Sequence, residues 1–77
     1  MHYTRPMTNT EKANTVARTH VRGAMDRPKA QDVQYAVDYL MGNHHFLGMR
    51  NEVMHRSILI SNGIDVDRMV YDFKFGA

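Results

Sequence analysis

Three breaks divide the chain into short segments and constrain its fold more than any other feature. Asp26-Arg27-Pro28, Gly42 and Asn62-Gly63 each follow a run whose apolar residues recur every three or four positions. Proline suits the first turn of a helix, and glycine suits the left-handed residue that ends one. We therefore expect an all-α fold, a small bundle of three main helices over residues 9–25, 28–41 and 44–61 and a short C-terminal helix over 66–73.

Two of these helices carry start signals of their own. Thr8 and Glu11 form a capping-box pattern, in which each side chain can bond the backbone amide of the other residue. Asp65 is a natural N-cap for the last helix, and Ile64 and Met69 are spaced to close a hydrophobic staple around it. Residues 1–7 show no periodicity and are expected to form an extended arm.

The C-terminal third has an alternative interpretation as β structure. The apolar run before Asn62-Gly63 and the one after it could pair as a hairpin, because Asn-Gly favours a tight two-residue turn. Residues 70–75 also alternate between apolar and polar side chains, as a strand does. An α+β fold with a C-terminal hairpin is therefore the alternative to the helical bundle.

The length and composition limit how the fold is stabilised. The chain has 77 residues and no cysteine, which predicts one domain with a small core and no disulfide. Small domains often gain stability by self-association, so we expect a homo-oligomer. No apolar run reaches the ~18 residues that a membrane span needs, and the first residues lack the apolar core of a secretory signal. We therefore expect a cytoplasmic protein that does not associate with a membrane.

Helical periodicity predicts which residues are buried. The first helix should bury Ala13, Val16, Ala17, His20, Val21, Ala24 and Met25, with His20 packed and hydrogen-bonded. The second should bury Ala30, Val33, Ala36, Val37, Leu40 and Met41. The third has apolar residues around half its circumference, at Phe46, Leu47, Met49, Val53, Met54, Ile58 and Ile60. A face this wide predicts a helix at the centre of the bundle or shared with another copy.

Two groups of residues are predicted to bind a partner. Tyr35 and Tyr39 are four apart and fall on the outer side of the second helix, where paired tyrosines are typical of contact surfaces. On a helix over 44–61, a polar sector gathers His44, Gly48, Glu52 and His55. Gly48 leaves a gap there that a partner's backbone could approach.

The same polar sector does not predict catalysis or a cofactor. Glu52 and His55 match the Glu-x-x-His unit of di-iron proteins, but that site needs further glutamates and the chain has only Glu11 besides. A metal shared across an oligomer interface stays open. Neither serine lies in a nucleophile elbow, there is no cysteine, and no glycine-rich loop is followed by Lys-Ser or Lys-Thr. We expect no enzyme activity.

Charge favours a second class of partner, nucleic acid. Residues 1–30 carry a net charge of +4 and residues 31–77 a net charge of −2. Basic side chains cluster on and after the first helix, at Arg18, Arg22, Arg27 and Lys29. Such a cluster can contact phosphates, although the total charge is small.

The sequence thus predicts a non-enzymatic binding protein that docks on another macromolecule and modulates or inhibits it. The sequence favours a protein as that partner. Free-standing chains of this size are often modulators made by phages or other mobile elements. The mechanism would be steric occlusion or bridging. The alternative is a small nucleic-acid-binding regulator that uses its basic first helix.

Overall fold

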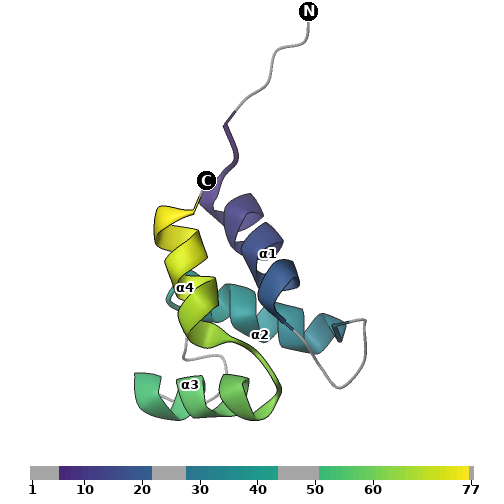
Figure 1. Cartoon of the computed structure of the whole chain (residues 1–77), viewed down its shortest axis with the longest axis vertical. Coiled ribbons are helices and arrows are strands. Elements are labelled where there is room, and N and C mark those ends of the chain that lie inside the picture. The colour runs from purple at the N-terminus through teal and green to yellow at the C-terminus, as the bar shows by residue number, and fades with distance from the viewer. Residues whose placement is uncertain (1–5, 22–27, 44–50, 77) are drawn as a thin grey trace, which may run out of the picture.

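The computed structural model describes residues 6–21, 28–43 and 51–76, and it confirms the all-α bundle. Figure 1 shows the four helices, α1 (Asn9–His20), α2 (Ala30–Leu40), α3 (Glu52–Ser61) and α4 (Val66–Phe75). No strand or sheet occurs within these three ranges, so the alternative with a C-terminal hairpin is wrong. The longest of the four helices has 12 residues, and none is long and apolar enough to cross a membrane.

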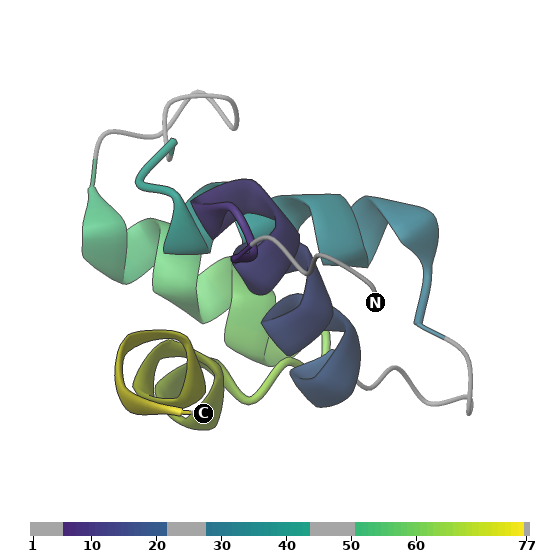
Figure 2. The same ribbon diagram turned by 90° about the horizontal axis from the view of Figure 1, so that it is seen from above.

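The helices form two crossing pairs. α1 and α4 lie side by side and antiparallel, and α2 and α3 form a second antiparallel pair that runs across the first (Figures 1 and 2). α2 contacts the other three helices, whereas α3 contacts α2 and α4 only. α3 therefore lies at one end of the molecule. The prediction that the third helix is the centre of the bundle is wrong.

Both predicted helix starts are confirmed. The backbone amide of Glu11 donates to the Thr8 hydroxyl at 3.1 Å, and the amide of Thr8 donates to the Glu11 carboxylate at 2.9 Å. This reciprocal pair satisfies two amides that would otherwise lack partners at the start of α1. At α4, the Asp65 carboxylate accepts from the Arg68 amide at 3.3 Å, and Ile64 and Met69 are both buried in the core.

α2 and α3 end in the same way, at a glycine with positive φ. Gly42 has φ 81° and Gly63 has φ 82°, a conformation that side chains rarely adopt. After α3, the Ile64 amide donates to the Leu59 carbonyl and the Gly63 amide to the Ile60 carbonyl. This pattern is a Schellman motif, and its characteristic apolar contact pairs Ile64 with Leu59. Asn62-Gly63 is thus a helix end.

α1 ends at His20, five residues earlier than predicted. Val21 has φ −82° and ψ 109°, which is extended backbone, and it forms an isolated antiparallel bridge with Ile64. The Asp65 amide donates to the His20 carbonyl at 3.4 Å. Leaving the helix here places the Val21 side chain in the core and gives this helix carbonyl a partner. The prediction of a helix to residue 25 is wrong for this reason.

α3 begins at Glu52, and not at residue 44. Asn51 has φ −107° and ψ 119°, and its side chain accepts from the Val53 amide at 2.8 Å, so it is the N-cap. An extended residue at this position interrupts a helix over 44–61, and that prediction is wrong. His44, His45, Phe46, Leu47, Gly48 and Met49 lie outside the described residues.

The core forms where α1, α2 and α4 meet. The predicted stripes of the first two helices are confirmed at Ala13, Ala17, Val21, Val33, Ala36 and Val37, all of which are buried. Alanines on α1 let α2 and α4 approach closely. Ala30 and Met41, predicted as buried, are exposed because they lie at the ends of α2. Ala24 and Met25 lie outside the described residues.

Candidate functional site

α3 turns an apolar, uncharged face outward. Val53, Met54 and Ile60 are 69%, 53% and 54% exposed, and Ser57 and Ser61 beside them are also exposed. We name these five residues the α3 outer face. It carries no charged side chain, which is unusual for the solvent side of a helix. Charged residues are depleted at the centres of protein interfaces in the same way.

The two charged residues of α3 face the other helices instead. The Glu52 carboxylate accepts a hydrogen bond from the Tyr39 hydroxyl at 3.2 Å, and the same hydroxyl accepts from Arg56 at 3.5 Å. Arg56 also forms an ion pair with Asp67 on α4. These contacts fix the rotation of α3, and they keep its charges off the outer face.

Tyr39 and His55 were predicted on exposed faces, and the structure buries both. Tyr39 is 7% exposed and His55 is fully buried, with their ring centroids 5.1 Å apart. The prediction that they form an open contact surface is wrong, because α3 packs this side against α2. Tyr35 is half-buried against the core, where Gln31 donates to its hydroxyl. His44 and Gly48 lie outside the described residues, so the structure brings together only Tyr39, Glu52 and His55.

The apolar residues of α3 predict the wrong rotation of this helix, so helical periodicity does not predict the α3 outer face. A signal for the correct phase exists in the sequence. A Schellman glycine at 63 pairs Ile64 with Leu59, which marks Leu59 as inward. At about 100° per residue, Glu52 and His55 then fall beside Leu59, while Val53, Ser57 and Ser61 fall opposite. The side of α3 that carries Leu59 therefore also carries a histidine and a glutamate, and hydropathy alone does not predict such polar residues on a packed side.

A second exposed apolar group lies at the end of α4. Tyr71 and Phe75 are 60% and 71% exposed, and their ring centroids are 5.2 Å apart. Each ring covers part of the other, as neighbours four apart on a helix do. Unlike the α3 outer face, this pair is flanked along the chain by charged residues, Asp72 and Lys74.

The basic residues of the alternative prediction are only partly described. Arg18 on α1 and Lys29 before α2 are exposed, whereas Arg22 and Arg27 lie outside the described residues. Arg18 lines a groove of about 410 Å³ between α1 and α2. Glu11 lines the same groove, so among the described residues that line it the charge of Arg18 is matched by one carboxylate. Phosphate binding needs an excess of positive charge.

The titratable side chains of the described part do not form a metal site. Residues 6–21, 28–43 and 51–76 contain no group of three or more histidine, aspartate or glutamate side chains that could hold an ion. His55 would have to leave the core to meet a second copy, because it is fully buried. His20 is largely buried, and its Nε2 contacts the Asp72 carboxylate, which joins α1 to α4. This confirms the prediction that His20 is packed and hydrogen-bonded.

Comparisons of the chain with models of known protein families, with curated proteins and with solved structures give no match.

Proposed function

We propose that this chain is a non-enzymatic binding protein of the cytoplasm that docks on another protein through the α3 outer face and modulates it by steric occlusion or bridging. The observation that carries the proposal is the exposure of Val53, Met54 and Ile60 on a face without charge. Scattered apolar residues are normal on protein surfaces. A group of three on one face of one helix, with the charged side chains of that helix bonded to α2 and α4, is a feature of interaction sites.

The size of the α3 outer face indicates how the partner binds. A standard interface buries roughly 800 Å² on each side, which three apolar side chains and two serines cannot supply alone. A partner that wraps α3 in an apolar groove would contact its flanks as well, as in other helix-in-groove complexes. Ser57, at the middle of the face, allows the groove floor to approach the helix closely. The partner we propose is therefore a protein with an apolar groove.

The experiment places a photo-crosslinking amino acid at Ser57, with matched placements at Gln34 on α2 and Phe75 on α4. All three positions are exposed in the isolated chain. We expect one host protein to be captured at position 57 only, and to remain bound at about 0.5 M salt, because apolar contacts resist screening.

Binding to that purified protein then tests the face directly. Val53→Ser with Ile60→Ser should weaken binding at least about tenfold, since each change removes apolar area worth ~1 kcal/mol or more. Gln34→Ser is the matched control and should bind normally. Capture at position 75 in place of 57, or binding that ignores the Val53 and Ile60 changes, contradicts the proposal. A crosslink between two copies of the chain would assign the face to self-association instead.

Nucleic acid is the second candidate partner, favoured by the exposure of Arg18 and Lys29 beside the basic first thirty residues. In that case binding to a DNA or RNA duplex should fall steeply with salt concentration. Arg18→Ala should lower the slope of that dependence by about 1, which is the effect of losing one phosphate contact. Binding that is indifferent to salt would exclude this candidate.

A further inference from the structure

A groove of about 260 Å³ lies where α2, α3 and α4 meet, on the opposite side of α3 from its outer face. We name it the three-helix groove. Its walls are formed by Tyr39 and Leu40 of α2, Glu52 of α3, and Val70, Phe73 and Lys74 of α4. Gly42 lies at its rim, where an added side chain would meet no atom of residues 6–21, 28–43 and 51–76 within 4 Å. The volume is below that of a drug-sized pocket and suits a small metabolite.

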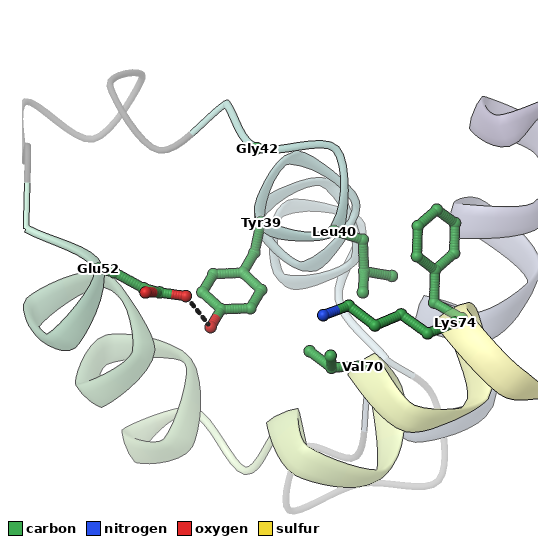
Figure 3. A pocket seen from close by; sticks show the side chains of 7 residues that line it. Tyr39, Leu40, Gly42, Glu52, Val70 and Lys74 are labelled. Carbon is green, nitrogen blue, oxygen red and sulfur yellow. Dashed lines mark hydrogen bonds between the residues drawn. The ribbon is translucent and has the colours of Figure 1, made fainter.

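Opposite charges stand at the two sides of this groove. Figure 3 shows the Glu52 carboxylate and the Lys74 ammonium group directed toward Tyr39 from opposite sides. Glu52 accepts from the Tyr39 hydroxyl at 3.2 Å, which orients its carboxylate. The two charged groups do not form an ion pair with each other. The apolar side chains of Leu40 and Val70 lie on either side of the Lys74 ammonium group (Figure 3).

We propose that the three-helix groove binds a free α-amino acid with an apolar side chain, such as leucine. The Lys74 ammonium would pair with the ligand's carboxylate, and Glu52 would pair with its ammonium group. The apolar side chain would lie against Leu40, Val70 and Phe73. This assignment does not depend on the α3 outer face.

A zwitterion fits this groove better than an ion of one sign. An anion would pair with Lys74 but would be repelled by the nearby Glu52 carboxylate. A cation would pair with Glu52 but would be repelled by the Lys74 ammonium group. Like charges at close range oppose binding, and opposite charges favour it. A ligand that carries both charges satisfies both side chains, and its apolar part uses walls that a purely polar ligand would leave in water.

Titration of ¹⁵N-labelled protein with L-leucine, followed by NMR, tests the assignment. We expect saturable shifts of backbone amides near Tyr39, Glu52 and Lys74, with a dissociation constant on the order of 1 mM, because the ligand is small and the groove is open. Two analogues measured on the unchanged protein separate the charges. Leucinamide lacks the carboxylate and 4-methylpentanoate lacks the ammonium group, and each should bind at least about fivefold more weakly.

Variants of the protein test the same contacts from the other side. Lys74→Gln and Glu52→Gln should each weaken leucine binding at least about fivefold, and Lys29→Gln is the matched control that should not. The glutamine at position 52 retains an acceptor for Tyr39, so the fold should persist. Absence of saturable shifts at about 20 mM leucine overturns the proposal. So does equal binding of either analogue, or leucine binding that both variants leave unchanged. Leucine binding should survive Val53→Ser with Ile60→Ser, which separates this site from the proposed docking face.

Discussion

Truncation of two adjacent residues, Leu59 and Ile60, tests the rotation of α3, on which the proposed docking face depends. Leu59 is fully buried and Ile60 is 54% exposed, although the two are equally apolar. Leu59→Ala removes a packed side chain and leaves a cavity, a change that costs about 2–5 kcal/mol. Ile60→Ala removes contacts that are largely with water, and alanine's better helix propensity offsets part of the loss. We expect its cost to stay within about 0.5 kcal/mol.

The difference is large on the scale of this domain. For 77 residues the free energy of unfolding should be about 4–12 kcal/mol. With a urea dependence of about 1 kcal/mol per molar, Leu59→Ala should lower the unfolding midpoint by about 2–5 M, and Ile60→Ala by less than about 0.5 M. Circular dichroism at increasing urea concentration measures both midpoints.

If Leu59→Ala fails to fold at all, Leu59→Met preserves most of the volume and should cost less than about 1.5 kcal/mol. The result that would refute our reasoning is the reverse order, in which Ile60→Ala is the more destabilising change. α3 would then be rotated so that its apolar residues face inward, as its hydropathy alone predicts. No outer face would remain for a partner.

Further changes test the contacts that hold the helices, all by urea unfolding. Thr8→Ala should cost about 1 kcal/mol by removing the cap of α1, and an unchanged midpoint would show that the capping box does not form in solution. Gly63→Ala should cost more than about 1 kcal/mol because φ is 82° there; a stabilising effect would contradict the left-handed helix end. His20→Ala and Asp72→Ala together should reveal a coupling of about 0.5–1 kcal/mol in a double-mutant cycle, whereas strict additivity would mean that the contact between α1 and α4 contributes nothing.

Local chemistry explains what the sequence could predict. The capping box of Thr8 and Glu11, the N-cap Asp65 and the helix ends at Gly42 and Gly63 each depend on residues within five positions. All the residues that form such a motif are close together in the sequence, so it can be predicted without knowledge of tertiary contacts. The number of helices, their order and most of their boundaries follow from such motifs. The burial of the alanines on α1 follows from helical periodicity.

The C-terminal end of α1 and the rotation of α3 depend on contacts between distant segments, and these are not predictable from periodicity. Val21 leaves the helix to pair with Ile64, which is 43 positions away. The apolar residues of the third helix spread over about half its circumference, and hydropathy places Val53 and Ile60 on the buried side, whereas the structure exposes both. The hydroxyl of Tyr39, which bonds both Glu52 and Arg56, selects the side that faces α2.

The position of α3 separates what stabilises this domain from what we propose it uses for binding. α1, α2 and α4 supply most of the buried residues, and α3 adds His55 and Leu59 from one side only. Substitutions on the opposite side therefore leave the core intact, and a loss of binding there would reflect the interface and not unfolding. A helix at the centre of the bundle could not offer that separation, since each of its faces would belong to the core.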